Sequence, residues 1–497
     1  MTDTRIHQPV FRHARNRPTA PAMSDPDLTV DYATFARMIE DAGARLRAAG
    51  AGPNSRVLIV GENCLSLTVF IMACAHIGAV AAPVNARMTA LELARIDAHA
   101  QPVARVFTSG ASAEAAFHAT GTKQSADYGT FHLDTAQPAL GITMPPDTAA
   151  LLYTTGTTGD PKGVMLSHGN LLFGGAASAD LRGMTGTDVI YGVLPISHVF
   201  GLNSMLVAAT IAGAHVRLAA RFSPEMLLDA LGRDVTILPA VPQMHAVLMS
   251  HAARAGIDRL QGGALKYVSS GAAPLDPEWK RKAEAFYGIA LQNGYGMTET
   301  TAGVTATRNS IGNPDTSVGL PFTGVEIALD PADSVDGVGE ILTRGPNIML
   351  GYFRNGSATD AVLSPDGWLR TGDLGRIDAD GRLHVVGRAK ELIIRGGFNV
   401  YPPEVEAALN DHPAVIQSAV IGRTLPGGNE EVLAFVQSAE PERLRAADLA
   451  AHVAERLSAY KRPSRIVIAA NLPAAATGKI LKHRLLAHFA AELDSDA

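Results

Sequence analysis

The stretch from Leu151 to Gly163 combines residue types that bind phosphate. It reads Leu-Leu-Tyr-Thr-Thr-Gly-Thr-Thr-Gly-Asp-Pro-Lys-Gly, and the apolar run Ala149 to Tyr153 predicts a short buried strand leading into it. Glycines let backbone N–H groups turn toward an anion, and threonine hydroxyls and a lysine ammonium add donors to phosphate oxygens. The stretch therefore indicates a polyphosphate-binding loop, although flexible surface loops share this composition.

This loop is not a Walker A loop. The Walker A pattern requires a glycine, four further residues and then Gly-Lys-Ser/Thr. Here Pro161 stands at the position of the second glycine, and Gly163 follows Lys162 where a hydroxyl would be needed to hold Mg²⁺. The Walker A interpretation is therefore rejected.

The loop resembles the phosphate loop of the adenylate-forming enzymes, the superfamily of acyl-CoA synthetases, peptide-synthetase adenylation domains and firefly luciferase. Other stretches match the same family in the family's own order, so the resemblance covers nearly the whole chain. They are Gly271-Ala272-Ala273-Pro274-Leu275, Asn293-Gly294-Tyr295-Gly296-Met297-Thr298-Glu299-Thr300, Gly367 to Asp373, Gly387 to Glu391, Arg395 to Pro402 and Thr477 to Leu481.

The resemblance implies how ATP is bound. Tyr295 would stack on the adenine, because an aromatic plane suits a purine face, and Asp373 with Arg388 would hold the ribose hydroxyls. Thr298 would meet the α-phosphate, and Glu299 would hold Mg²⁺, for which a carboxylate is a suitable hard-oxygen ligand. The implied ATP-binding set is Thr154, Thr155, Gly156, Thr157, Thr158, Gly159, Lys162, Gly271, Ala272, Ala273, Asn293, Gly294, Tyr295, Gly296, Thr298, Asp373 and Arg388.

The resemblance also assigns roles near the C-terminus. Lys479 would be the catalytic lysine of adenylate formation, although a lysine at the start of a terminal helix is ordinarily a surface residue. Lys390 would be the hinge between two domains. The thioester-forming face would consist of Gly396, Gly397, Phe398 and Asn399, where two adjacent glycines permit close approach of a narrow thiol chain.

The resemblance also implies a pocket for a carboxylic acid substrate, with His198 at its mouth. Taken alone, His198 is as readily a core or capping histidine. The lining residues would be Val199, Phe200, Ser204, Gly271, Gly294 and Gly303. They are apolar or small and include no arginine or lysine. Because a buried unpaired charge is costly, dicarboxylates are disfavoured and an apolar monocarboxylate is expected, either a medium or long fatty acid or an aryl acid.

The resemblance implies an AMP-forming acyl-CoA synthetase, with ATP and coenzyme A as co-substrates and Mg²⁺ as the cofactor. The catalytic residues would be Lys479, Glu299, Thr298 and His198. Two alternatives stay open: an adenylating enzyme that loads a separate carrier protein, and a catalytically silent nucleotide-binding or scaffold protein. The joint presence of Lys162, Glu299, Asp373, Arg388 and Lys479 argues against the second, since a binder has no use for Lys479.

The elements that must position these residues alternate along the chain. Strands are predicted at Leu28–Val30, Arg56–Val60 and Val80–Val84, and helices at Leu65–Ile77 and Ala90–Ala98. A further helix, capped by Ser167, is predicted to end at Leu172. This alternation predicts parallel-rich sheets sandwiched by helices. A glycine-punctuated β-rich module is expected over Gly319–Leu350, and the polar region from Gly110 to Pro146 shows little periodicity.

The predicted fold class is α/β, with a large N-terminal body, residues 1–387, and a small mobile α+β domain, residues 388–497. In the second domain, helices are predicted at Pro402–Leu409, Ala447–Leu457 and Ile480–Phe489. The strands between them are predicted at Val415–Ile421, Val432–Gln437 and Arg465–Ala469.

Composition sets the remaining limits. The net charge of −6 over 497 residues argues against nucleic-acid partners, since phosphate neutralisation needs a basic excess. Two cysteines, Cys64 and Cys74, build neither a disulfide framework nor a metal site, so a cytoplasmic setting is expected. The apolar stretch Leu65 to Val84 suits a buried helix and strand better than a transmembrane segment. A monomer or homodimer is expected.

Overall fold

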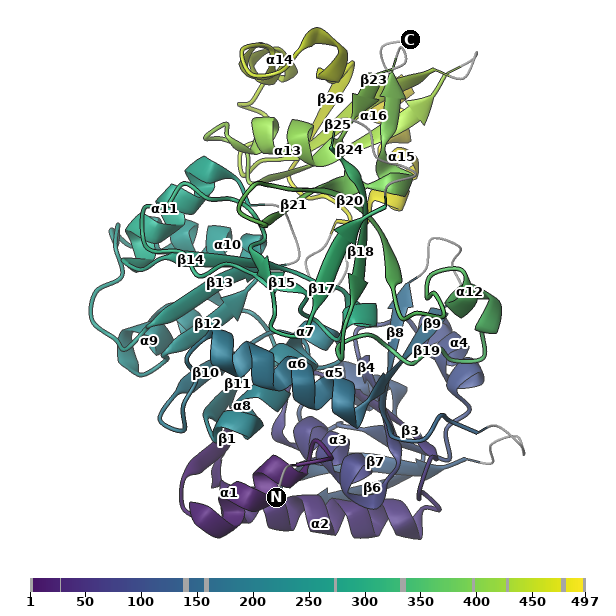
Figure 1. The fold of residues 1–497 in the computed structure, drawn as a ribbon. Coiled ribbons are helices and arrows are strands. Elements are labelled where there is room, and N and C mark those ends of the chain that lie inside the picture. The colour runs from purple at the N-terminus through teal and green to yellow at the C-terminus, as the bar shows by residue number, and fades with distance from the viewer. Residues whose placement is uncertain are drawn as a thin grey trace.

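The computed structural model describes residues 3–26, 28–136, 143–155, 161–271, 275–330, 337–395, 398–425, 429–474 and 480–494. Two large sheets with helices packed on them form the body, and a small α+β lobe lies at the C-terminal end (Figure 1). The predicted fold class is therefore confirmed.

One large sheet has eight strands in the order β19-β9-β8-β4-β3-β5-β7-β6. Its centre is parallel because β3, β4, β5 and β8 run in the same direction, and the strands outside them pair antiparallel. The strands are β3 (Arg56–Gly61), β4 (Val80–Asn85), β5 (Ala104–Phe107), β6 (Thr122–Ala126), β7 (Gly129–Thr135), β8 (Thr148–Thr155), β9 (Pro161–Ser167) and β19 (Gly351–Tyr352); their helices are α3 (Leu65–Ile77), α4 (Ala90–Ala100) and α5 (Ala113–His118).

The other large sheet has nine strands in the order β16-β15-β14-β13-β12-β10-β11-β1-β2, with a parallel run from β14 to β1. Its strands are β1 (Pro21–Asp25), β2 (Leu28–Asp31), β10 (Val189–Gly192), β11 (His215–Leu218), β12 (Ile237–Ala240), β13 (Tyr267–Gly271), β14 (Leu291–Tyr295), β15 (Thr305–Ala306) and β16 (Leu320–Pro321). The associated helices are α1 (Gln8–Asn16), α2 (Tyr32–Ala48), α6 (His168–Leu181), α7 (Val199–Gly201), η1 (Leu202–Val207), α8 (Ala208–Ala212), α9 (Pro224–Arg233), α10 (Pro242–Arg254), α11 (Pro277–Tyr287) and η2 (Thr298–Thr300).

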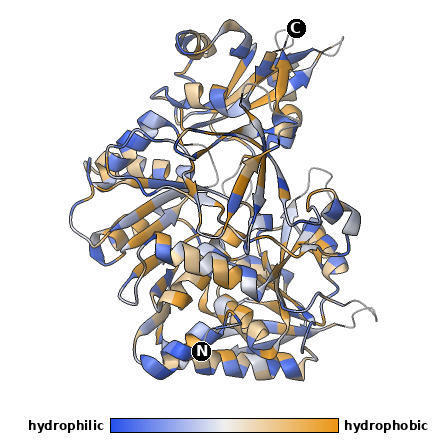
Figure 2. Cartoon of the chain, viewed as in Figure 1, coloured by the Kyte–Doolittle hydropathy of each residue, from blue (hydrophilic) through white to orange (hydrophobic). Residues whose placement is uncertain are grey.

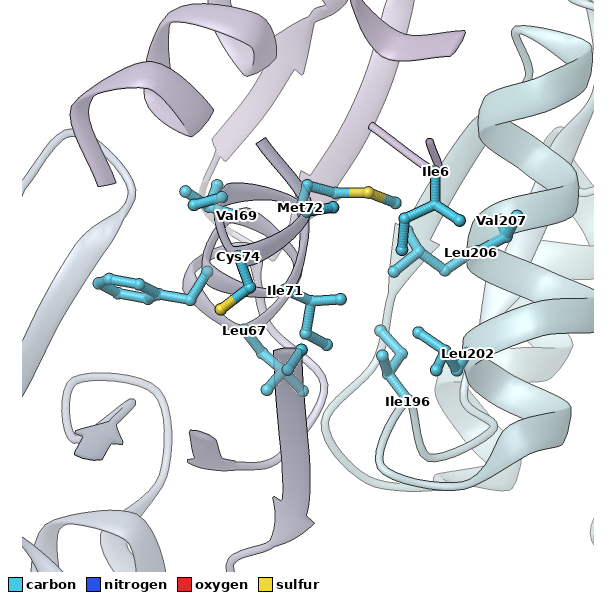
Figure 3. Close-up of a cluster of buried hydrophobic side chains, with 14 of the residues drawn as sticks. Ile6, Leu67, Val69, Ile71, Met72, Cys74, Ile196, Leu202, Leu206 and Val207 are labelled. Carbon is cyan, nitrogen blue, oxygen red and sulfur yellow. The ribbon is translucent and has the colours of Figure 1, made fainter. Parts of the chain in front are cut away.

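Helix α3 explains the long apolar stretch that begins at Leu65. Every residue of α3 except His76 is buried, and it packs against η1 through Ile71 and Leu202 among others (Figure 3). Apolar residues concentrate in the central strands of the body (Figure 2). A helix that is apolar on all sides must be enclosed by protein or lipid, and here protein encloses it. Among the described residues, no helix has both the length and the apolar character required to cross a bilayer.

Helix α6 begins as predicted but continues well past the expected end at Leu172. Ser167 caps it, since its side chain accepts a hydrogen bond from the N–H of Asn170. The helix then runs through Gly174 and Gly175 to Leu181. A Cβ on Gly175 would lie 2.8 Å from a methyl carbon of Val207, so the glycines allow close packing against η1 rather than ending the helix.

The region from Gly110 to Pro146 holds α5, β6 and β7, none of which its weak periodicity predicted. Strand β7 buries Phe131 and Leu133, and Phe70 of α3 meets Phe131 edge to face with ring centroids 4.8 Å apart. An edge hairpin with few apolar side chains has little sequence signal, and its order comes from this packing.

The β-rich module is larger than predicted. It is a four-stranded antiparallel sheet of β17 (Glu326–Leu329), β18 (Gly339–Arg344), β20 (Leu369–Ile377) and β21 (Leu383–Arg388), with the short helix α12 (Gly356–Asp360) inserted. The chain leaves the module at β19 to complete the eight-stranded sheet and then returns.

The lobe has its own apolar clusters, which contain only residues from Ile393 onward. Its elements are η3 (Ala389–Glu391), β22 (Ile393–Arg395), β23 (Phe398–Val400), α13 (Pro402–Asn410), β24 (Gln417–Thr424), β25 (Glu430–Gln437), α14 (Ala446–Ala454), η4 (Ala459–Lys461), β26 (Arg465–Ala469), α15 (Lys482–His488) and α16 (Ala490–Asp494). The three predicted strands and the helices at Pro402 and Ala447 are present, and the terminal helix begins at Lys482 rather than Ile480.

Candidate active site

The predicted phosphate loop connects two paired strands. β8 and β9 form an antiparallel hairpin in which Thr154 pairs with Lys162 and Tyr153 with Gly163. Gly156, Thr157, Thr158 and Gly159 lie outside the described residues, as does the side chain of Thr155. The register nevertheless places Thr154 and Lys162 opposite each other where the loop starts and ends.

Tyr352, which the sequence analysis did not identify, contacts both Lys162 and Glu299. The Nζ of Lys162 lies 5.0 Å from the centre of the Tyr352 ring, and the Tyr352 hydroxyl donates a 2.8 Å hydrogen bond to Oε1 of Glu299. Tyr352 sits on β19, where it pairs with Val164 of β9. Only the tertiary pairing of β19 with β9 reveals this role, because residue 352 falls in none of the recognised motifs.

The backbone around Glu299 is tightly constrained. Glu299 lies in the single turn η2, and Thr301 and Ala302 after it have φ angles of 51° and 80°. Non-glycine residues adopt such angles only where surrounding contacts impose them. A Cβ on Gly296 would lie 1.5 Å from the carbonyl oxygen of Ala302, so this position requires glycine. The turn therefore holds both Thr298 and Glu299, which are buried.

The chemistry at Glu299 suits Mg²⁺. Glu299 is 8% exposed, the Tyr352 hydroxyl donates to its Oε1, and no other described side chain donates to the carboxylate. Within the described ranges, no three His, Cys, Asp or Glu side chains come together as a metal cage. Mg²⁺ in nucleotide sites is commonly held by one or two carboxylates together with the substrate phosphates. A single buried carboxylate with a free oxygen fits that arrangement.

The predicted ribose residues meet the predicted adenine residue. The Tyr295 hydroxyl donates a 2.6 Å hydrogen bond to Oδ2 of Asp373, and Nε of Arg388 lies 3.1 Å from Oδ1 of the same carboxylate. Asp373 on β20 and Arg388 on β21 are direct partners across the strand pair. Burial and the neighbouring Asp373 carboxylate raise the pKa of Tyr295 well above its usual value, so its hydroxyl remains a donor. Residues from three separate motifs thus form one cluster.

The segment predicted to lie against the adenine begins at the carboxyl edge of the parallel strands, with Gly271. Gly271, at the end of β13, pairs with Gly294 of β14. Asn293 is buried and donates to the carbonyl of Ser317 at 3.1 Å. Ala272 and Ala273 lie outside the described residues. In open α/β sheets, ligands bind beyond the carboxyl ends of such strands.

Two aromatic rings lie against glycines of the predicted acyl pocket. A Cβ on Gly271 would lie 3.2 Å from the Phe200 ring, and one on Gly303 would lie 2.3 Å from the ring of Phe322. His198 is exposed and caps α7, where its Nδ1 accepts from the N–H of Phe200 at 3.3 Å. Phe322 belongs to no recognised motif, so the sequence reading missed it.

A buried cation lies next to another predicted pocket residue. Arg182 donates through Nη1 to the carbonyl of Ser204, and its guanidinium is 5.8 Å from the centre of the Tyr267 ring. Its Nε has no hydrogen-bond partner, and within the described ranges no carboxylate pairs with it. Ser204 is buried, with its hydroxyl bonded to Ser178 at 3.3 Å, and Val199 packs into the main apolar cluster.

The candidate residues of the lobe that the structure describes are exposed. Lys390 lies on the surface in η3, and Asn399 is exposed on β23. Phe398 is 57% exposed and stacks on Tyr460 with ring centroids 4.8 Å apart. Gly396, Gly397 and Lys479 lie outside the described residues. Lys390, Phe398 and Asn399 are therefore presented to solvent.

One ion-pair cluster links the two ends of the lobe. Lys482, the first residue of α15, lies 2.7 Å from Glu391 and 2.9 Å from Glu406. Burial opposes its charge, but these two carboxylates outweigh burial and raise the pKa of Lys482. The segment that follows residue 479 is thereby fixed to the segment that follows Lys390.

Comparison with known proteins gives consistent matches. Residues 10–353 match the model of the AMP-binding enzyme family, and residues 404–479 match its C-terminal domain model. A feruloyl-CoA synthase from Amycolatopsis sp is 33% identical, with 96% of this chain and 98% of that protein covered. A sulfoacetate–CoA ligase from Cupriavidus necator is 34% identical, with 95% of each covered. The crystal structure of ATP-bound MatB from Rhodopseudomonas palustris superposes with a TM-score of 0.84 at 28% identity, covering 98% of this chain and 99% of that one.

Proposed function

The chain belongs to the AMP-binding enzyme family and is an AMP-forming acid–CoA ligase that uses ATP and CoA, and we propose that its acid is an apolar aryl or fatty monocarboxylate. The observation that carries the site assignment is the convergence of two clusters: Tyr295 with Asp373 and Arg388, and Lys162 with Tyr352 and Glu299. Each cluster brings together residues that are far apart in the sequence, and together they supply the aromatic ring, carboxylates and cations that bind a nucleotide.

In this proposal the body holds ATP and, after pyrophosphate leaves, the acyl-adenylate. Asp373 accepts from the ribose hydroxyls, with Arg388 beside it, and Tyr295 lies against the adenine. Thr154, the hairpin loop and Lys162 bind the terminal phosphates. Glu299 would hold Mg²⁺, and the bound ion would supply positive charge next to the phosphate oxygens.

Adenylate formation needs positioning and charge rather than a protein nucleophile. A carboxylate oxygen of the acid bonds to the α-phosphorus, the bond from that phosphorus to the bridging oxygen breaks, and pyrophosphate leaves with the electron pair. Negative charge accumulates on non-bridging oxygens, where Thr298 and Lys479 donate.

Thioester formation requires different groups at the same place. We propose that residues 388–497 rotate about Lys390, withdrawing Lys479 and presenting Gly396 to Asn399. The CoA sulfur then bonds to the acyl carbon, the thiol loses its proton, and the bond from that carbon to AMP breaks. One hinge thereby alternates two sets of groups.

The aromatic walls support an apolar acid. Phe200 and Phe322 lie against Gly271 and Gly303, and aromatic side chains favour a flat apolar ligand. A feruloyl-CoA synthase among the relatives acts, by its name, on an arylacrylic acid. An aryl acid is therefore the first class to test.

Arg182 favours a second class, acids with an additional anionic group. A buried cation without a carboxylate partner is costly unless a ligand offsets it. The sulfoacetate–CoA ligase among the relatives takes, by its name, such an acid. Arg182→Met would then lower kcat/KM for an anionic acid while sparing an uncharged aryl acid.

The experiment is a panel of straight-chain, aryl and sulfonated or dicarboxylic acids, assayed for AMP release with ATP and CoA. Highest kcat/KM with aryl or fatty monocarboxylates supports the proposal, and preference for the doubly charged acids supports the second class. Replacing CoA by a phosphopantetheinyl carrier protein tests the alternative that the enzyme loads a carrier. AMP release with the carrier but not with CoA would reject the ligase assignment.

A further inference from the structure

Tyr352 contacts two candidate ATP-binding residues that come from distant parts of the chain. Its hydroxyl donates to Oε1 of Glu299 at 2.8 Å, and its ring faces the ammonium of Lys162 at 5.0 Å. Tyr352 is 7% exposed and Glu299 is 8% exposed. A hydrogen bond and a cation–π contact of this kind are both stronger when shielded from water.

The backbone fixes the tyrosine between its partners. Tyr352 pairs with Val164, and the N–H of Phe353 donates to the carbonyl of Gly163 at 2.7 Å. On the other side, the N–H of Met349 donates to the carbonyl of Glu299 at 2.9 Å. The segment around β19 is therefore bonded to both the Lys162 strand and the Glu299 turn.

The chemistry of the contact leaves Glu299 available for a cation. The tyrosine hydroxyl occupies one carboxylate oxygen and orients the other. A tyrosine hydroxyl is protonated at neutral pH and can therefore donate to the carboxylate. Partners that orient a metal ligand in this way commonly change metal affinity when they are removed.

We propose that Tyr352 is a positioning residue that sets Glu299 and Lys162 relative to each other for binding of Mg²⁺–ATP. The proposal rests on the proposed function, which assigns Glu299 to the cation and Lys162 to the phosphates. Tyr352 itself touches neither the acid nor CoA in this assignment.

The test measures Mn²⁺ binding by electron paramagnetic resonance in the presence of a non-hydrolysable ATP analogue, so that no turnover is needed. Tyr352→Phe keeps the ring and removes the hydroxyl, and it should weaken Mn²⁺ binding about 10–100-fold. Tyr128→Phe is the matched control, because the Tyr128 hydroxyl also donates to a carboxylate, Asp41, at 2.8 Å, far from the site. Unchanged Mn²⁺ affinity in folded Tyr352→Phe would overturn the proposal.

Two further variants separate the hydroxyl from the ring. Tyr352→Leu should also weaken binding of the analogue in EDTA, about 2–5-fold, because the cation–π contact is lost. Combining Tyr352→Phe with Glu299→Gln should weaken Mn²⁺ binding no more than Glu299→Gln alone, and additive losses would contradict coupling through Glu299. If wild-type protein binds no Mn²⁺–nucleotide, the proposed function fails; if it binds and Tyr352→Phe binds equally well, only this inference fails.

Discussion

Glu299 and Asp373 of the body are buried, whereas the described candidate residues of the lobe are exposed. In the body, Glu299 and Asp373 are buried and bonded to tyrosines that come from other strands. In the lobe, Phe398 is 57% exposed, and Lys390 and Asn399 also lie on the surface. Under the proposed function, the nucleotide site of the body is already formed, whereas the groups of the lobe must move toward it.

This difference predicts how variants divide between the two half-reactions. A change in the body should affect every step that needs the nucleotide. A change in the lobe should affect only the step for which that face is presented. Adenylate formation is measured by ATP–pyrophosphate exchange. Thioester formation is measured by the consumption of CoA when the acyl-adenylate is supplied.

Lys479→Ala is expected to have the largest effect. Under the proposed function this change removes a cation that acts on the α-phosphate, and losses of about 10²–10³-fold are typical when such a preorganised donor is removed. Pyrophosphate exchange should fall by that factor while thioester formation from the acyl-adenylate is retained. Equal loss of both steps would reject its assignment to the first.

Asp373→Ala, a change in the body, should impair both steps, in contrast to Lys479→Ala in the lobe. It removes the ribose acceptor and leaves Tyr295 and Arg388 without their partner, and the loss of charged hydrogen bonds predicts a fall of about 10²-fold in kcat/KM for ATP. Use of the acyl-adenylate should weaken similarly. A loss confined to one step would contradict the common nucleotide site.

Gly397→Val should impair thioester formation and spare adenylate formation, which is the reverse of the pattern expected for Lys479→Ala. Added bulk on the thioester face should slow CoA consumption about 10–100-fold, because small misplacements near reacting groups are costly. Pyrophosphate exchange should be unchanged. Normal CoA consumption would contradict the two-face account.

Acid should destabilise the body more than the lobe. Burial lowers the pKa of His168 and of His245 to about 4, so both are neutral when folded and must be desolvated if charged. Their stabilising effect is present above the unfolded pKa and is lost as the pH falls from about 6.5 toward 4, by about 2 kcal/mol each at pH 5. His245→Gln should flatten the pH dependence of unfolding in urea, and an unchanged slope would contradict this origin.

The sequence predicted the fold best where periodicity was strong. Helix α3 has the predicted bounds Leu65–Ile77, because its apolar run ends at the left-handed Gly78. The hairpin β6–β7 was missed because its edge strands carry few apolar residues. Helix α6 was cut short because glycine in a helix ordinarily weakens it, whereas Gly175 here serves close packing.

The site was predictable only as far as the motifs extend. Tyr295, Asp373 and Arg388 were named from separate motifs, and the structure brings them together. Tyr352, Phe322 and Arg182 were not found, since each acts through a tertiary contact that no local pattern encodes. Contacts between distant strands decide such roles.

The most direct test of the account measures whether the lobe moves. Spin labels on Arg281→Cys in the body and Arg443→Cys in the lobe occupy exposed positions, while Cys64 and Cys74 are buried and should not be labelled. The account predicts one interspin distance with ATP and a different one with an acyl-adenylate analogue and CoA. The same distance distribution in both states would contradict it.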